Sequence, residues 1–335
     1  MSLHPYEQLT PDVVLDALDS VGLRGDGRLM ALSSYENRVY QVSLESAIPV
    51  IGDSVVAKFY RPGRWSNAQI AEEHAFATEL MASEIPVVGA LTLQGTTLHH
   101  YAGFAFSVSP RRGGRRPELE DLAVLAWIGR FLGRIHLIGQ AKSFKHRPAL
   151  DMQTFAYASH DILLKGNYLP LDMASRWRNA FAAAMQVAQS VFERAGSFQS
   201  FRLHGDCHPG NILWTPEGST DAGPHFVDLD DARTGPAVQD LWMLLAGDRA
   251  QCTRQLGALI VGYEEFREFD RRELVLIEAL RTLRLVHYSA WLAQRWTDPI
   301  FPINFPWFGS SDYWKGQIDM LEEQTEAMQA SALLV

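Results

Sequence analysis

The stretch RLHGDCHPGNILW, residues 202–214, places two histidines, an aspartate, a cysteine and an asparagine in a short segment with apolar ends. Three kinds of site use such residues: a metal site, a site with a nucleophilic thiol, and a loop that holds a catalytic carboxylate. Each kind needs different partner residues elsewhere in the chain. The flanking sequence therefore decides among them.

The histidines and the cysteine are weak evidence for a metal or a thiol site. A zinc site would use His204, Cys207 and His208, but the sequence offers no second cluster of ligands. A nucleophilic Cys207 could take either histidine as its base, yet that interpretation leaves the polar residues of the other motifs without a role. We expect His204 to organise the loop and Cys207 to be a small, partly buried residue that is open to oxidation.

The carboxylate interpretation uses more of the stretch. His204, Asp206 and Asn211 form the pattern H-x-D-x-x-x-x-N, which is the spacing of a phosphotransferase catalytic loop. A carboxylate can orient and deprotonate an incoming hydroxyl, whereas a neutral amide oxygen binds a hard cation without repelling phosphates. We predict that Asp206 is the proton acceptor and that Asn211 binds Mg²⁺.

A second acidic segment, HFVDLDDA at residues 225–232, follows shortly afterwards. Asp228 lies at the end of a short apolar strand, where a phosphotransferase needs a second carboxylate for the metal, and Asp230 is a weaker candidate. The spacer TPEGSTDAGP, residues 215–224, is rich in turn residues and predicts a hairpin. Such a hairpin would direct both acidic motifs toward one ion.

The segment VVAKFY, residues 55–60, supplies a cation for the phosphates of ATP. Lys58 in an apolar strand matches the V-A-I-K type of signature, in which the lysine also pairs with a helix glutamate. A snorkelling lysine is the commoner role of such a residue. Glu73 shares a helix face with apolar residues and is favoured as the partner, while Glu72 stays an alternative. The motifs occur in the order strand lysine, helix glutamate, Asp–Asn loop and strand-end aspartate, and this order supports a phosphate-binding role for Lys58.

The rest of the chain predicts two lobes and an α+β fold class. Residues 1–108 combine several strand patterns with two helices, one at residues 10–22 with Thr10 as its cap and one at residues 66–84 with Ser66 or Asn67 near its cap. This pattern predicts a small N-terminal lobe that binds ATP. Residues 109–335 are mostly helical and carry the catalytic and metal-binding loops. Helical patterns there cover residues 119–140, 171–197, 237–266 and 270–297.

Three further segments leave alternatives open. Asp240, near the start of a predicted helix, either accepts backbone N–H bonds from the catalytic loop or only favours the helix N-terminus. The run RRGGRR, residues 111–116, is either a solvated connection or a docking site for an acidic partner. The three prolines of DPIFPINFPWF, residues 298–308, exclude a helix and predict packed aromatic residues.

Composition restricts the partners. The chain has 30 basic and 39 acidic residues and a net charge of -9, so it lacks the charge of a nucleic-acid binder. The two cysteines, Cys207 and Cys252, form no CxxC pair, which favours a reducing compartment. No apolar run reaches the roughly 18 residues that a membrane span requires. We therefore expect a cytoplasmic monomer that binds neither nucleic acid nor membrane.

The segments VVAKFYRPGRW, EEHAFATEL, HGDCHPGNILW and FVDLDDARTGPAVQDLWMLL together resemble the aminoglycoside phosphotransferase and choline kinase superfamily, and within it the bacterial stress-response kinases. The resemblance implies a protein-kinase-like two-lobed fold, and a serine/threonine kinase that uses ATP and Mg²⁺, phosphorylates a protein and itself, and acts in stress. It implies that Lys58 and Glu73 anchor the phosphates. It also implies that Ser34 of SSYENRVY, residues 33–40, lies against ATP.

The sequence departs from the protein-kinase pattern in three ways. It has no G-x-G-x-x-G, so that Ser33, Ser34 or backbone N–H groups must contact the phosphates, and DLD replaces DFG. Only eleven residues separate Asp228 from Asp240, which leaves no room for a long activation loop. This short connection favours a small hydroxyl-bearing acceptor, of the aminoglycoside, choline or homoserine kinase type. A non-catalytic ATP-binding module is the remaining alternative.

Overall fold

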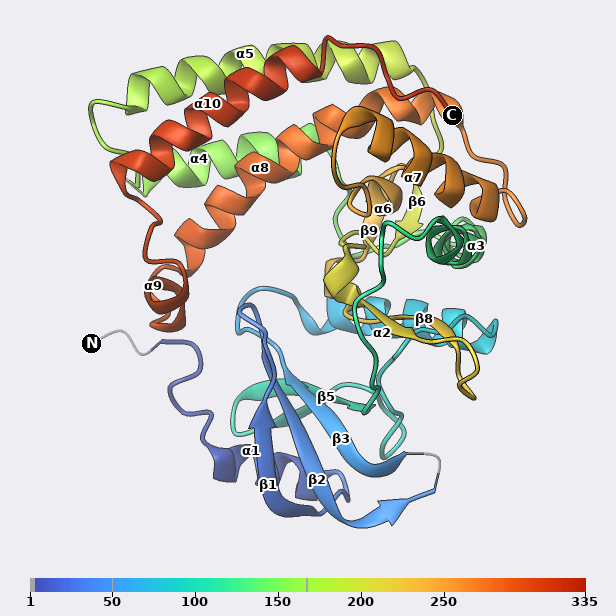
Figure 1. The fold of residues 1–335 in the computed structure, drawn as a ribbon. Coiled ribbons are helices and arrows are strands. Elements are labelled where there is room, and N and C mark those ends of the chain that lie inside the picture. The colour runs from blue at the N-terminus through green and yellow to red at the C-terminus, as the bar shows by residue number, and fades with distance from the viewer. Residues whose placement is uncertain (1–3, 50, 167) are drawn as a thin grey trace. The chain divides into compact units, whose positions relative to one another are not determined.

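The computed structural model describes residues 4–49, 51–166 and 168–335, and its contacts divide the chain into two compact units. Unit 1 consists of Met1–Pro117, Phe144–Arg147 and His208–Ala232. Unit 2 consists of Glu118–Ser143, Pro148–Cys207 and Arg233–Val335. Unit 1 combines a sheet with helices and unit 2 is mainly helical, which confirms the predicted α+β fold class (Figure 1).

The division differs from the predicted boundary after residue 108 because a late segment of the chain joins unit 1. The N–H of Val88 donates to the carbonyl of Phe226 at 2.9 Å, and the N–H of Arg115 donates to the carbonyl of Trp214 at 3.0 Å. These bonds join residues 208–232 to the N-terminal part of the chain. Sequence order places the same residues in the second lobe, because it does not reveal such long-range pairing. The assignment of functions to two lobes stays a prediction.

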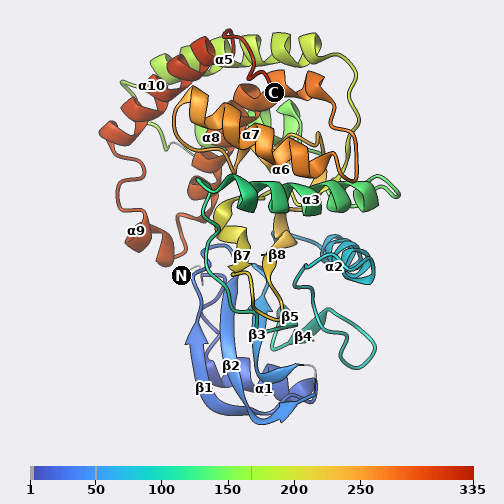
Figure 2. The ribbon, with the colours of Figure 1, turned by 45° about the vertical axis from the view of Figure 1, so that its right-hand side comes forward.

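A five-stranded antiparallel sheet forms the centre of unit 1, in the order β1-β2-β3-β5-β4 (Figure 2). The strands are β1 (Gly25–Ala31), β2 (Arg38–Ile48), β3 (Gly52–Phe59), β4 (His99–Tyr101) and β5 (Phe104–Pro110). Helix α1 (Pro11–Ser20) begins after the cap Thr10, as predicted, and its apolar side chains share one hydrophobic core with those of β2, β3 and β5. This core buries Val55, Ala57 and Phe59 of β3, the strand that carries Lys58.

Two further elements of unit 1 surround the predicted site. Helix α2 (Asn67–Ala82) begins with a reciprocal capping box between Ser66 and Gln69. The predicted hairpin is present as β7 (Ile212–Thr215) and β8 (Gly223–Phe226). Sequence patterns predict both the helix and the hairpin because helical periodicity and turn residues act locally.

The helices of unit 2 pack in pairs, with α3 along α7, α5 along α10 and α4 along α8 (Figures 1 and 2). They are α3 (Leu122–Gly139), α4 (Ala158–Lys165), α5 (Ala174–Ala195), α6 (Gln239–Trp242), α7 (Arg249–Tyr263), α8 (Leu276–Arg295), α9 (Ile300–Asn304) and α10 (Ser311–Ala327). Gly129, Gly133 and Gly262 let α3 and α7 approach so closely that a Cβ atom at any of them would overlap backbone atoms of the other helix.

Sequence patterns missed several elements of unit 2. The strands β6 (Phe201–Leu203) and β9 (Arg233–Gly235) pair antiparallel but are only three residues long. Their sequences are too short for a period-2 pattern. The predicted helical patterns also leave out α4 and the longer α10, although both are regular helices that contact α8.

Two predictions about helices are wrong. The helix expected over residues 237–266 is divided into α6 and α7, because Gly247 adopts a φ of 97° and Asp248 begins a new helix with a capping box to Gln251. The proline-rich segment does contain a helix, α9, with Pro302 as its third residue. A proline is tolerated there because N–H groups of the first turn have no partner within the helix.

The aromatic side chains of the same segment pack together, as predicted. The ring centroids of Trp291 and Phe301 lie 5.0 Å apart, and those of Phe301 and Phe305 lie 5.6 Å apart. This cluster joins α8 to α9. The bulky rings therefore serve to anchor the C-terminal region within unit 2.

Among the residues that the structure describes, one helix, α3, is long and apolar enough to cross a membrane. Half of this helix is buried within the protein, where it packs along α7. A helix in a protein core meets the same criteria of length and composition, so this observation is weak evidence for a membrane span.

Candidate functional site

A cavity of about 370 Å³ in unit 1 gathers the predicted site residues of that unit. Its walls come from the loop after β1, from β3, α2 and β5, and from the β7–β8 hairpin with the residues that follow it. The predicted residues among its lining are Ser34, Lys58, Glu73, Asn211 and Asp228. Residues that are up to 194 positions apart in the sequence thus share one cavity.

Lys58 is a positively charged residue in the wall of this cavity. Its Nζ lies 2.7 Å from Oδ1 of Asp228 and 3.3 Å from Oδ1 of Asp230. Burial lowers the pKa of Lys58, but the two carboxylates more than offset this effect and hold the pKa well above its ordinary value. Lys58 is therefore charged and suited to an anionic ligand such as a phosphate.

Asp228 and Asp230 differ sharply although only one residue separates them. The side chain of Asp228 is 50% exposed, and its backbone has the left-handed conformation with φ 60° and ψ 62°. Asp tolerates that conformation better than most residues. Asp230 is buried and ion-paired to Lys58 and Arg64, and its pKa is held at about 2 because these cations outweigh the effect of burial. Asp230 acts as an anchor, whereas Asp228 is open to a ligand.

Asn211 lies in a single helical turn directly before β7. Its N–H donates to the carbonyl of His208 at 2.9 Å, and its carbonyl accepts from the N–H of Val227 at 3.0 Å. The second bond joins Asn211 to the residue that precedes Asp228. An amide oxygen and an accessible carboxylate on one cavity wall fit a hard divalent cation, because such ions prefer oxygen ligands.

The structure separates the two glutamates of α2. Glu73 lines the cavity and is buried, and burial raises its pKa to about 7 although Lys58 opposes the shift. Glu72 instead accepts the backbone N–H groups of Lys145, His146 and Arg147 at 2.5–3.0 Å. No ion pair within 4.0 Å joins Lys58 to either glutamate in the described part of the chain. Their expected pairing stays a prediction.

A serine loop replaces the glycine-rich loop of protein kinases. Ser33 and Ser34 both line the cavity. Asn37 holds the end of this loop, since its side-chain amide donates to Asp230 at 3.1 Å and its oxygen accepts from the N–H of Arg61 at 3.1 Å. The loop is thus tied to the acidic side of the cavity. The expected contact of Ser34 with ATP stays a prediction.

Sequence reasoning missed Arg112 as a candidate binding residue. Arg112 belongs to the RRGGRR run, for which the sequence predicts either a solvated connection or a docking site. In the structure Arg112 lines the cavity. It pairs with Asp221 at 3.0 Å. No local pattern distinguishes it from the other arginines of the run. Only the end of β5 at Pro110 places it beside the hairpin.

Asp206 belongs to unit 2, where Asp240 organises the loop that leads to it. The side chain of Asp240 accepts the N–H of His204 at 2.9 Å and the N–H of Gly205 at 2.8 Å, which confirms the first of its two predicted roles. His136 contacts the same carboxylate at 3.0 Å. Burial raises the pKa of Asp240, but these partners lower it below its ordinary value. Gly205 has a φ of 83°, which favours glycine.

Asp206 itself is partly accessible. Its side chain is 19% exposed, and its Oδ1 lies 2.7 Å from Nη1 of Arg284 in α8. The neighbouring Cys207 is fully buried rather than partly buried, and burial raises the pKa of its thiol well above the ordinary value. A buried, protonated thiol is a poor nucleophile and a poor metal ligand. In the described residues no group of three or more His, Cys, Asp or Glu forms a metal site.

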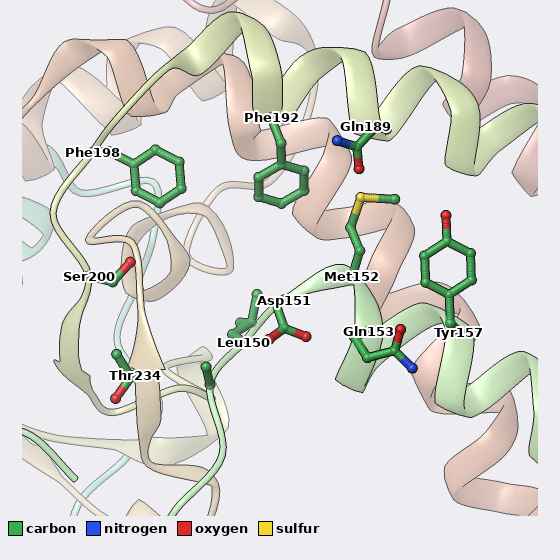
Figure 3. A pocket seen from close by; sticks show the side chains of 11 residues that line it. Leu150, Asp151, Met152, Gln153, Tyr157, Gln189, Phe192, Phe198, Ser200 and Thr234 are labelled. Carbon is green, nitrogen blue, oxygen red and sulfur yellow. The ribbon is translucent and has the colours of Figure 1, made fainter.

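A second cavity, of about 490 Å³, lies within unit 2 and is mostly apolar. Figure 3 shows Met152, Phe192 and Phe198 around it. Its one acidic residue, Asp151, accepts the N–H of Thr154 at 2.7 Å. The lining has no basic residue and no second acid. These residues do not provide the groups that phosphoryl transfer requires.

Comparison with known proteins agrees with the chemistry of the first cavity. The model of the phosphotransferase enzyme family matches residues 29–275. The chain is 43% identical over 332 residues to Stress response kinase A of Escherichia coli (strain K12), covering 99% of this chain and 97% of that relative. It is 42% identical to serine/threonine protein kinase RdoA of Salmonella typhimurium (strain LT2), covering 96% of this chain and 94% of that relative.

A solved structure is also similar in fold. It is amicoumacin kinase hAmiN in complex with AMP-PNP, Ca²⁺ and Ami. The TM-score is 0.69 at 18% sequence identity, over 94% of this chain and 93% of the other. The family model matches most of this chain, and each of the two relatives covers nearly all of it. The chain therefore belongs to the phosphotransferase enzyme family.

Proposed function

We propose that this phosphotransferase transfers the γ-phosphoryl group of ATP to serine or threonine hydroxyls of a protein, including its own chain. The observation that carries the proposal is the cavity in unit 1, which combines a charged lysine, an accessible aspartate, an amide oxygen and a serine loop. The name of the Salmonella relative, serine/threonine protein kinase RdoA, supports a protein acceptor. We place the reaction in the cytoplasm, as part of a stress response.

Each group has a proposed role in this reaction. Lys58 binds the phosphates of ATP, with Glu73 and Ser34 beside it. Asp228 and Asn211 would hold Mg²⁺, which supplies charge neutralisation for the phosphates when bound. The acceptor oxygen forms a bond to the γ-phosphorus, the bond from that phosphorus to the β–γ bridging oxygen breaks, and ADP leaves. Asp206 takes the proton of the acceptor hydroxyl.

A small-molecule acceptor is the second candidate. The similar solved structure is a kinase complexed with a nucleotide analogue and Ami. The connection of eleven residues between Asp228 and Asp240 also leaves little chain for docking a peptide. Both observations support an acceptor smaller than a protein, and the experiment must therefore include one.

The purified protein would be mixed with γ-labelled ATP, Mg²⁺ and a generic protein acceptor such as casein. We expect label in the acceptor and in the protein itself, and we expect Asp206→Ala to reduce transfer by about 1,000-fold. Asp172→Asn, an exposed acid of unit 2, is the matched control and should transfer label normally. Omitting the divalent cation should abolish transfer.

Two other outcomes would contradict the proposal. If no protein acquires label while an amino alcohol or an amino sugar stimulates ADP release, the acceptor is a small molecule. If the nucleotide binds without any turnover and Asp206→Ala changes nothing, the chain is a non-catalytic ATP-binding module. The three outcomes are distinguished by labelled protein, labelled small molecule and absence of product.

A further inference from the structure

A shallow cavity of about 280 Å³ lies on unit 2 and connects to Asp206 through one residue. It is formed by α6, α8 and α10, and its lining is Trp242, Arg281, Arg284, Leu285, Tyr288, Met320, Glu323 and Gln324. Arg284 is part of this lining and also lies 2.7 Å from Asp206. A molecule in the cavity would therefore contact the partner of the proposed proton acceptor.

One face of α8 provides most of the cavity wall. Arg281, Arg284, Leu285 and Tyr288 follow the helical spacing i, i+3, i+4 and i+7. Tyr288 is 38% exposed and stacks on Trp291 with ring centroids 5.6 Å apart. The face offers an aromatic surface next to two guanidinium groups.

The two arginines are held in different ways. The guanidinium of Arg281 lies 5.5 Å from the ring centroid of Trp242 and pairs with Glu278 at 3.1 Å. Arg284 pairs with Asp206, and its side chain is 39% exposed. Arg281 is thus fixed by an aromatic ring and an acid of its own helix. Arg284 is the arginine whose partner takes part in the proposed chemistry.

The charges of the lining favour an acidic acceptor over a cationic one. Two arginines and one acid, Glu323, line the cavity. Each guanidinium group is paired with an acid, Arg281 with Glu278 and Arg284 with Asp206. A carboxylate of the acceptor can replace such an acid and form a bidentate pair with the guanidinium, whereas an amino group cannot. The apolar groups of Leu285, Tyr288 and Met320 can contact the side chains of a peptide.

The distance between Arg284 and Asp206 limits where the acidic residue stands in the acceptor. The two groups are in direct contact, and an extended chain advances about 3.3 to 3.6 Å per residue. A hydroxyl at Asp206 and a carboxylate at Arg284 must therefore come from residues about one or two positions apart.

We infer that this cavity, as part of the proposed protein kinase function, binds the acidic flank of a serine or threonine acceptor segment. Arg284 exchanges its ion pair with Asp206 for one with the acceptor carboxylate. The exchange leaves Oδ1 of Asp206 available for the hydroxyl proton. Arg284 is thus a positioning and specificity residue, and an acceptor without an acidic flank would leave the resting ion pair in place.

The test compares peptides that differ only beside the serine. Each carries one serine with Glu, Gln or Lys at the positions one and two residues away, and phosphorylation is followed at fixed ATP and Mg²⁺. For the wild type we expect KM to be about 10-fold lower for the Glu peptide than for the Gln peptide, and higher still for the Lys peptide. Raising the salt concentration should reduce this preference.

Arg284→Ala should remove the preference by raising KM for the Glu peptide toward that for the Gln peptide, with KM for ATP unchanged. Arg284→Lys keeps the charge and should keep part of the preference. Arg272→Ala is the matched control, because Arg272 is an exposed arginine that pairs with Asp270 and does not line the cavity. Thermal unfolding would verify that each variant is folded.

The possible results separate this inference from the proposed function. Equal KM values for the three peptides in the wild type, or an unchanged preference in a folded Arg284→Ala protein, would overturn the inference while protein phosphorylation stands. The salt series on the wild type tests the charge argument even if Arg284→Ala does not fold. Absence of label in every peptide and protein, with ADP release driven by a small hydroxyl compound, would overturn the proposed function itself.

Discussion

Each unit holds a pair of acids in which one member is buried and the other is accessible. In unit 1 the side chain of Asp230 is 4% exposed and that of Asp228 is 50% exposed. In unit 2 the side chain of Asp240 is fully buried and that of Asp206 is 19% exposed. The two units share no strand, yet both place the accessible acid next to a loop that the buried acid holds.

The buried acids have partners that offset the cost of removing a charge from water. Asp230 is bound by Lys58, Arg64 and Asn37, and Asp240 by a histidine and two backbone N–H groups. The accessible acids keep part of the side chain exposed, 50% for Asp228 and 19% for Asp206, where a ligand can reach it. The comparison suggests that buried acids contribute mainly to stability and accessible acids mainly to function.

The largest expected effect is on the buried acid of unit 2. Asp240→Ala removes the acceptor of two loop N–H groups and the partner of His136, and should lower the free energy of unfolding by about 4 kcal/mol. Asp206→Ala should lower it by less than about 1 kcal/mol, because its pair with Arg284 is partly exposed. Urea unfolding measures the free energy of unfolding of both variants. A similar decrease in the two variants would refute the distinction between a stabilising buried acid and a functional accessible acid.

The next effect concerns Glu73, a buried acid whose Oε2 has no hydrogen-bond partner among the described residues. Its pKa is raised to about 7 in the folded state from an ordinary 4.5, so the folded state binds more protons than the unfolded state between these values. Stability should therefore fall as the pH rises through this window. Glu73→Gln removes this dependence, and its stability relative to the wild type should rise by about 2 to 3 kcal/mol from about pH 5 to pH 8.

Denaturant unfolding at several pH values checks this expectation. Glu72→Gln is the matched control, because Glu72 is accessible and bonded to three backbone N–H groups. A constant difference between Glu73→Gln and the wild type across the pH range would show that the Glu73 carboxyl titrates normally. Burial would then have no measurable effect on the pKa of Glu73.

A smaller effect is expected at Gly205, which connects the buried acid of unit 2 to the accessible one. Its φ of 83° disfavours a side chain, so Gly205→Ala should destabilise the protein by about 1 to 2 kcal/mol. Gly316→Ala in α10 should have the opposite sign, because the new Cβ has open space and alanine favours a helix. Equal thermal unfolding of the two variants would argue against conformational strain at Gly205.

The smallest effect on stability is expected for the accessible acid of unit 1. Asp228→Asn should change the free energy of unfolding by less than about 1 kcal/mol while phosphoryl transfer falls. Asp230→Asn, its buried counterpart, should destabilise the protein more because Arg64 and Lys58 lose a charged partner. Calorimetry and labelled-ATP assays on the same samples would reveal whether stability and transfer separate as expected.

Local sequence signals predicted much of the fold. Thr10, Ser66 and the turn residues between β7 and β8 were correctly interpreted, because capping and turn formation involve neighbours in the sequence. The division of α6 from α7 was missed because the apolar pattern continues across the turn at Gly247. The strands β6 and β9 were missed because three residues carry no periodicity.

The candidate site shows the same division. The sequence by itself predicts Lys58, Glu73, Asn211, Asp228 and Asp206 as site residues, because motifs depend on residue type and on spacing along the chain. Their roles stay predictions. Tertiary structure alone decided that Glu72 caps a distant backbone segment, that Arg112 lines the cavity and that Arg284 pairs with Asp206. These residues contact partners between 73 and 109 positions away in the sequence, and only folding brings such residues within the range of hydrogen bonds and ion pairs.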